Sequence, residues 1–181
     1  MAVNQHITKF YKSATDRDFS RDFLFRVTQL KLAGMQPLDD DDLVYVRTAS
    51  LPGRAVTNVP TPFMGLPFNI PGNATYPGSD AYKISFYLDA NSSLRRFLEN
   101  ASRELFDDAS STGNYSTPGN EAYLVLQQLD KQLEPIKNGK YKLIGASLRT
   151  IDPVEYSISE GTGKWVTIDA TIAYHFYTIP K

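Results

Sequence analysis

The 181-residue chain contains no cysteine and only two histidines, His6 and His175. Without cysteine it forms no disulfides and offers no thiolate metal ligands or thiol nucleophiles, which fits a reducing compartment. No apolar run approaches the roughly 20 residues of a membrane-spanning helix, and the N-terminus has no apolar core of a signal peptide. The formal net charge is −1, so the chain lacks the positive excess of common nucleic-acid binders.

Catalytic motifs are missing as well. There is no Gly-x-Ser-x-Gly nucleophile elbow, and the stretch at 161–164 lacks the first glycine of a P-loop. The acidic run at 39–42 has neither the alternating spacing nor the glycine of a calcium loop, so it predicts a solvated loop or, alternatively, a contact with a basic partner. His175 is expected to pack or hydrogen-bond within a strand. The sequence therefore predicts no enzyme, no cofactor and no metal site.

The segment at 50–76 is rich in proline and in large apolar residues. It holds five of the eleven prolines. Because proline lacks an N–H and fixes φ, this segment can be neither a helix nor a central strand. A flexible linker would not carry so many apolar groups. We expect an extended segment packed on a surface, with a neighbouring copy as the natural candidate. The residues expected to pack between subunits are Val59, Phe63, Met64, Phe68 and Ile70.

Alternation of apolar and polar residues predicts a mainly β fold. Residues 1–20 are polar without clear periodicity and predict an arm that becomes ordered on assembly. Phe23, Phe25 and Val27 are expected on one face of the first strand, which is expected to form a hairpin with the second. The last strand is about twice the usual length, which favours a sandwich or barrel. The predicted strands lie at 23–32, 43–51, 82–89, 141–151 and 165–179. The pattern at 122–130 is compatible with a helix or a strand and favours a strand.

One segment, at about 92–106, has convincing helical periodicity. Its apolar residues recur at i, i+3, i+4, i+7 and i+11 and form one stripe that is expected to face a sheet. Asn91 or Ser92 is expected to cap its first turn. A long polar loop is expected at 107–120.

Several short motifs follow one another between Asp22 and Ile179. They are DFLFRVTQLK, TASLPG, VTNVPTPFMGLPFNIPG, the strand and helix at 82–98, the Asp-Pro-Val turn at 152–154 and a final AYHFY strand. In this order they resemble the tail tube proteins of contractile-tailed bacteriophages, the myovirus tail tube family.

The resemblance implies a β-sandwich or barrel with one flanking helix, an arm at 1–20 and a single domain at 21–181. Six copies would form a ring, and stacked rings would form a hollow tube that conducts double-stranded DNA during ejection. The implied partners are other copies of the chain, the tail sheath protein, and baseplate and tail terminator proteins. DNA would pass without specific binding, and no membrane anchor is implied. The tube would belong to a virion assembled in the host cytoplasm.

Duplex DNA carries about one negative charge per 1.7 Å, so an acidic and neutral polar lumen is expected to let it slide. The candidates for this lining are Asp89, Asp169 and Glu155. The predicted first hairpin and the strand at 82–89 are expected to contribute to it. Alternative assignments are a baseplate tube initiator or a secretion-system tube subunit. Outside the family, the alternative is a sugar-binding β-sandwich with an exposed aromatic groove.

Overall fold

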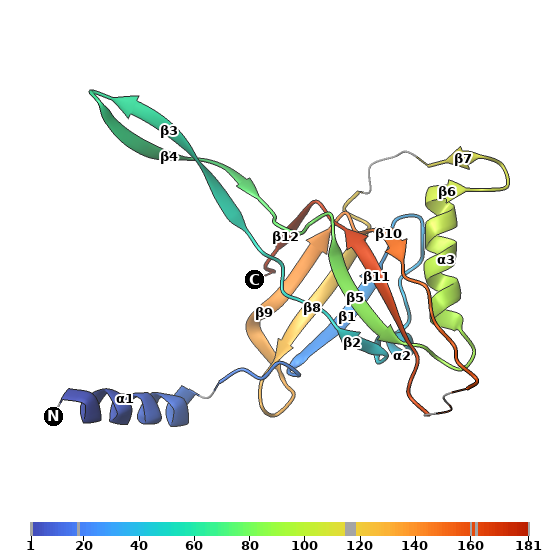
Figure 1. The fold of residues 1–181 in the computed structure, drawn as a ribbon, viewed down its shortest axis with the longest axis horizontal. Coiled ribbons are helices and arrows are strands. Elements are labelled where there is room, and N and C mark those ends of the chain that lie inside the picture. The colour runs from blue at the N-terminus through green and yellow to red at the C-terminus, as the bar shows by residue number, and fades with distance from the viewer. Residues whose placement is uncertain (1, 18, 115–118, 160, 162, 181) are drawn as a thin grey trace.

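A computed structural model describes residues 2–17, 19–114, 119–159, 161 and 163–180. Its body consists of two β-sheets and a helix, and two long projections leave one end of that body (Figure 1). One projection is helix α1 (Ala2–Arg17), and the other is the hairpin of β3 (Ala55–Phe63) and β4 (Leu66–Thr75). The expected mainly β fold is confirmed. The helix in the N-terminal arm was not predicted.

Each sheet of the body has four antiparallel strands. The first has the order β1-β8-β9-β12 and the second the order β10-β11-β5-β2. The sheets are open, so the structure is a sandwich and not a closed barrel. The first sheet comprises β1 (Phe25–Lys31), β8 (Tyr123–Leu129), β9 (Pro135–Ile144) and β12 (Phe176–Thr178). The second comprises β10 (Ser147–Ile151), β11 (Thr167–Ala173), β5 (Tyr82–Tyr87) and β2 (Val46–Thr48).

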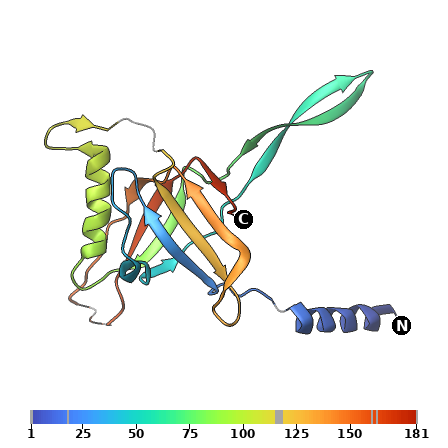
Figure 2. The ribbon, with the colours of Figure 1, turned by 180° about the vertical axis from the view of Figure 1, so that it is seen from behind.

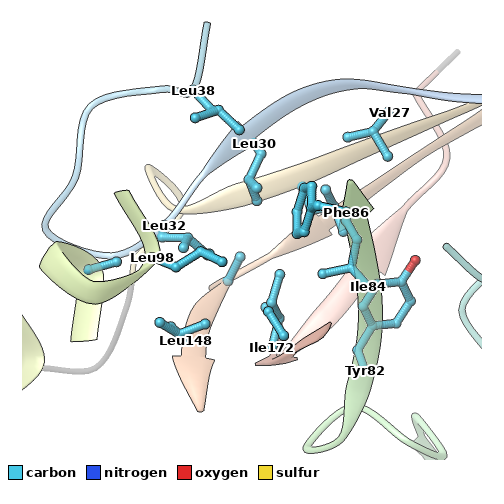
Figure 3. Packing of buried hydrophobic residues seen from close by; sticks show 14 of the residues in the cluster. Val27, Leu30, Leu32, Leu38, Tyr82, Ile84, Phe86, Leu98, Leu148 and Ile172 are labelled. Carbon is cyan, nitrogen blue, oxygen red and sulfur yellow. The ribbon is translucent and has the colours of Figure 1, made fainter. Parts of the chain in front are cut away.

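The core lies between the two sheets. Leu30 of β1 faces Phe86 of β5, and both are fully buried (Figure 3). The alternation predicted for β5 is confirmed, because Tyr82, Ile84 and Phe86 are buried. Helix α3 (Ser93–Leu105) closes one end of the sandwich and buries an apolar stripe, as predicted. Each large apolar side chain buried here contributes about 1.5–3 kcal/mol relative to exposure.

The predicted hairpin between the first two strands is wrong. β1 pairs with β8, whereas β2 pairs with β5 in the other sheet. The chain crosses between the sheets through a short helix, α2 (Asp40–Leu43), and buries Leu38 and Leu43 on the way. The predicted face of the first strand is also partly wrong, since Phe23 is 67% exposed while Leu24 is buried.

The two long strands predicted near the C-terminus are each broken where the chain changes sheet. Gly145, with φ +78°, separates β9 from β10, and the break between β11 and β12 falls at Tyr174 and His175. The breaks lie together, because the His175 N–H donates to the Ile144 carbonyl at 2.8 Å. The expectation of one long curling strand is therefore corrected to two strands in different sheets.

At this crossing between the sheets, position 145 accommodates only glycine without strain. A Cβ there would lie 2.1 Å from His175 Cδ2, and its positive φ disfavours any L side chain. We expect Gly145→Ala to destabilise the fold by about 2 kcal/mol, which lowers Tm by several degrees in thermal denaturation. Gly119→Ala is the matched control, because nothing lies within 4 Å of its added Cβ. An unchanged Tm for Gly145→Ala would contradict this assignment.

The predicted polar loop at 107–120 contains a small two-stranded element, formed by β6 (Phe106–Asp107) and β7 (Thr112–Gly113). Asp107 organises its turn, because its carboxylate accepts hydrogen bonds from Ala109 N–H and from the N–H and hydroxyl of Ser110. Residues 115–118 of the predicted loop lie outside the described residues.

Candidate assembly surface on the β3–β4 arm

The proline-rich segment forms a two-stranded antiparallel ribbon, called here the β3–β4 arm (residues 55–75). It projects well beyond the body in both views (Figures 1 and 2). Its turn consists of Met64 and Gly65, with φ of 49° and 77°. Two consecutive positive φ values are typical of the type I′ turn that joins tightly paired strands. The expectation of an extended segment that is no central strand is confirmed.

The β3–β4 arm carries no Asp, Glu, Lys or Arg. Its large apolar side chains are nevertheless exposed, from 46% for Val56 to 88% for Met64. Neither strand pairs with the sheets of the body among the described residues. An isolated two-stranded ribbon is marginally stable in water. A ribbon that is both apolar and uncharged therefore indicates a surface that is covered by another molecule.

The register of the β3–β4 arm separates its side chains into two faces. Directly paired residues share a face, and successive pairs alternate. One face, called here the apolar arm face, is made by the pairs Val59–Ile70, Thr61–Phe68 and Phe63–Leu66. The opposite face, called here the proline face, is made by the pairs Asn58–Pro71, Pro60–Asn69 and Pro62–Pro67. Four of the five residues predicted to pack between subunits lie on the apolar arm face, and the fifth, Met64, lies at its tip.

The prolines occupy the positions whose nitrogens point out of the ribbon. Phe63 and Leu66 flank a two-residue turn and so form a hydrogen-bonded pair, and such pairs alternate with non-hydrogen-bonded ones. The pairs with proline are therefore the non-hydrogen-bonded ones. At these positions the N–H of another residue would face outward, ready to bind a further strand. Proline removes that donor, so both edges of the β3–β4 arm are poor templates for strand addition.

The base of the arm is fixed to the second sheet through Tyr82. The Tyr82 hydroxyl donates to the Ser50 carbonyl at 2.6 Å, and the Ser50 N–H donates to the same hydroxyl at 3.1 Å. Burial raises the pKa of Tyr82 to about 12, so this hydroxyl keeps its proton at neutral pH. The body thus holds the segment just before β3.

Asp89, one of the predicted lumen residues, caps helix α3. Its carboxylate accepts from Ser93 N–H at 2.9 Å, Ser93 Oγ at 3.0 Å and Leu94 N–H at 3.3 Å. The predicted caps are wrong, because Ser92 adopts a left-handed conformation without a side-chain cap bond and Asn91 makes none of these bonds. Burial alone would raise the pKa of Asp89, but the bonds from Ser93 and Leu94 outweigh it and lower that pKa.

We expect Asp89→Ala to reduce the free energy of unfolding by about 1 kcal/mol at pH 7, the usual effect of losing a cap. Because the pKa of Asp89 is lower in the folded state than its ordinary value of 3.8, the ionised carboxylate stabilises the fold fully above pH 3.8. This stabilisation is lost as the pH falls below 3.8 and through the pKa of the folded state. Denaturant unfolding at pH 7 and at pH 2.5 measures both parts. Asp108→Ala serves as the control. A difference between wild type and Asp89→Ala that is equal at both pH values would contradict the capping role.

Asp169 and Glu155, the other two predicted lumen residues, line one groove of about 530 Å³ beside β11. Asp169 lies on the outward face of the second sheet, where the Ser85 hydroxyl donates to its carboxylate. Neighbouring outward positions on β11 are Thr167 and Thr171. Asp89 is not among the residues that line this groove. The structure therefore brings two of the three candidates to one groove, which Lys164 and Trp165 also line, and Lys83 shares the outward sheet face with Asp169.

Sequence reasoning missed a basic surface on the outward face of the first sheet. Strand pairing places Arg26, Lys31, Lys140 and Lys142 on this face. The ammonium of Lys142 lies 4.2 Å from the ring centroid of Tyr123, a cation–π contact. These cations come from β1 and β9, so only the pairing of both strands with β8 reveals that they share a face.

Within the described ranges, no group of three His, Cys, Asp or Glu side chains is arranged to hold a metal ion. No helix in that part of the chain is long and apolar enough to cross a membrane.

No family model matches the sequence, and no curated protein matches it. Solved structures do. A chain in the cryo-EM structure of the anti-feeding prophage baseplate superposes with a TM-score of 0.60 at 13% identity, covering 88% of this chain and 94% of that one. A chain of the anti-feeding prophage tube-terminating cap gives 0.56 at 10% identity, covering 90% and 91%. A chain of the PVC sheath-tube complex, an extracellular contractile injection system, gives 0.52 at 9%, covering 92% and 95%. The protein therefore shares its fold with components of contractile, phage-like tails, in agreement with the mainly β sandwich that the resemblance implies.

Proposed function

We propose that the protein is the repeating structural subunit of a contractile-tail tube, in which six copies form a ring and rings stack into a hollow tube. The observation that carries the proposal is the exposed, uncharged β3–β4 arm, since a surface of this kind needs a partner. The shared fold supports it, because its relatives come from assembled particles. In this role the chain is non-catalytic, with residues 1–20 as an arm and 21–181 as the tube domain.

The proposed tube has the partners that a tail requires. These are other copies of the chain, a sheath protein around it, and baseplate and terminator proteins at its ends. Double-stranded DNA would pass through the lumen during ejection without specific binding. We assign Asp169 and Glu155 to the lumen, because they line one groove and Asp169 lies beside Ser85, Thr167 and Thr171 on the outward face of the second sheet. Asp89 remains a lumen candidate in addition to its capping role. The particle is a virion tail assembled in the host cytoplasm.

A baseplate tube initiator is the second candidate. It is favoured by the likeness to a chain of a baseplate structure, which has a higher TM-score, 0.60, than the chain of the sheath-tube complex, 0.52. An initiator would form one ring without further stacking, whereas a repeating subunit would stack without a fixed length.

Negative-stain electron microscopy with mass photometry of the purified protein tests the proposal. Hollow tubes of variable length are expected for the repeating subunit, and single rings would favour the initiator. A monodisperse monomer at high concentration, also in the presence of a preformed baseplate, would overturn both.

A further inference from the structure

Helix α1 carries a second exposed apolar surface. Ile7, Phe10, Tyr11 and Ala14 recur at i, i+3, i+4 and i+7 and form one stripe, called here the α1 stripe. Ile7 is 47%, Phe10 60% and Tyr11 66% exposed. Beyond the helix, the ring of Phe10 contacts only that of Phe19 among the described aromatic pairs. A lone helix of 16 residues is close to the marginal length of about 12–15 in water, so packing on a partner would stabilise it.

Three of the four charged residues of α1 lie away from this stripe, and the fourth, Arg17, is the last residue of the helix. At 100° per residue, Lys9, Lys12 and Asp16 fall on the opposite side of the helix. The α1 stripe therefore matches an uncharged surface, because a charged one would lose hydration without gaining a counter-charge. The apolar arm face is such a surface, since no residue of the β3–β4 arm is charged.

The two surfaces also match in length. From Ile7 to Ala14 the helix rises about 10 Å, and from Val59 to Phe63 the strand spans about 13 Å. A helix packed on the face of a β-ribbon is a standard two-layer arrangement. The prolines at both edges of the β3–β4 arm oppose the addition of a further strand. A partner would therefore bind the apolar arm face through side chains.

The α1 stripe and the apolar arm face do not meet within one molecule. Both projections leave the same end of the body, opposite α3, but they point in different directions in both views (Figures 1 and 2). Each copy therefore offers one stripe, of which Phe10 also contacts Phe19 of its own chain, and one arm face. Such a pair suits a heterologous contact, in which every copy gives one surface and receives the other.

We propose that the α1 stripe of one copy packs on the apolar arm face of a second copy. This inference rests on the proposed self-assembly and names the surfaces that join two copies. It assigns to the N-terminal helix a direct role in the contact, and it excludes β-augmentation as the way in which the arm binds.

Cross-linking between singly substituted copies tests the contact, and the absence of native cysteine makes each introduced thiol unique. Ala14→Cys lies on the α1 stripe and Thr61→Cys on the apolar arm face, and both keep the large apolar side chains. The two variants are mixed in equal amounts, assembled and treated with a short bis-maleimide. The expected product is a covalent dimer of one copy of each variant.

The matched control mixes Lys12→Cys with Asn69→Cys, which lie on the charged side of α1 and on the proline face of the arm. We expect at least tenfold less dimer from the control. If rings or tubes form by electron microscopy but the Ala14–Thr61 pair cross-links no more than the control, the inference is overturned while the proposed function stands. If no assembly and no cross-link form, both fall.

Discussion

Val59→Asp combined with Phe68→Asp is expected to abolish assembly and leave a folded monomer. Both residues lie on the apolar arm face and are about half exposed in the isolated chain. In the assembled state, each aspartate would be buried in an apolar contact without a partner for its charge. Burying an unpaired charge costs several kcal/mol of binding free energy. Mass photometry measures the loss of rings and tubes, and circular dichroism with thermal denaturation verifies the fold.

The control for this variant is Asn58→Asp combined with Asn69→Asp. It introduces the same two charges on the proline face of the same arm. We expect this control to assemble like wild type, because that face is not proposed to be covered. Equal loss of assembly in both double variants would mean that charge anywhere on the arm is disruptive, and it would refute the assignment of one binding face.

Phe86→Ala is expected to have the largest effect on the stability of the body. Phe86 is fully buried in the core between the two sheets (Figure 3). Truncation of a buried phenylalanine destabilises by about 3–5 kcal/mol, a large part of the 5–15 kcal/mol that is typical of a domain. Denaturant unfolding gives the change directly.

Phe63→Ala provides the contrast, because Phe63 lies on the arm and is 64% exposed. We expect it to change the free energy of unfolding of the monomer by less than about 0.5 kcal/mol while weakening assembly. The opposite pattern, with a stable Phe86→Ala and an unstable Phe63→Ala, would mean that the arm belongs to the folding core.

Local sequence patterns correctly predicted the elements that bury one face and expose the other. Alternation identified β5, and helical spacing identified α3, because in both cases one face is buried and the other is wet. The extended conformation of the β3–β4 arm followed from its prolines together with its many large apolar residues. These predictions needed no knowledge of which strand lies beside which.

The errors arose where the answer depends on strand pairing. The pairing of β1 with β8 and of β2 with β5 requires a crossing between sheets that no local pattern specifies. The breaks at Gly145 and at His175 looked like continuous strand for the same reason. The restriction at Gly145 follows only from its proximity to His175, which the sequence alone does not reveal.

The sequence predicted the residues of the candidate assembly surface but not their arrangement. Val59, Phe63, Phe68 and Ile70 were identified as packing residues, but their common face follows from the register of β3 with β4. The α1 stripe was present in the sequence as Ile7, Phe10, Tyr11 and Ala14. Its signal was weak because the polar residues around it dominate the composition of the first 20 positions.

A cryo-EM reconstruction of the assembled protein tests the central claim most directly. We expect hollow rings or tubes in which the apolar arm face is buried between copies and the edges of the β3–β4 arm pair with no further strand. An assembly in which Val59, Phe68 and Ile70 remain exposed to solvent, or in which the arm adds as a strand to a neighbouring sheet, would contradict it.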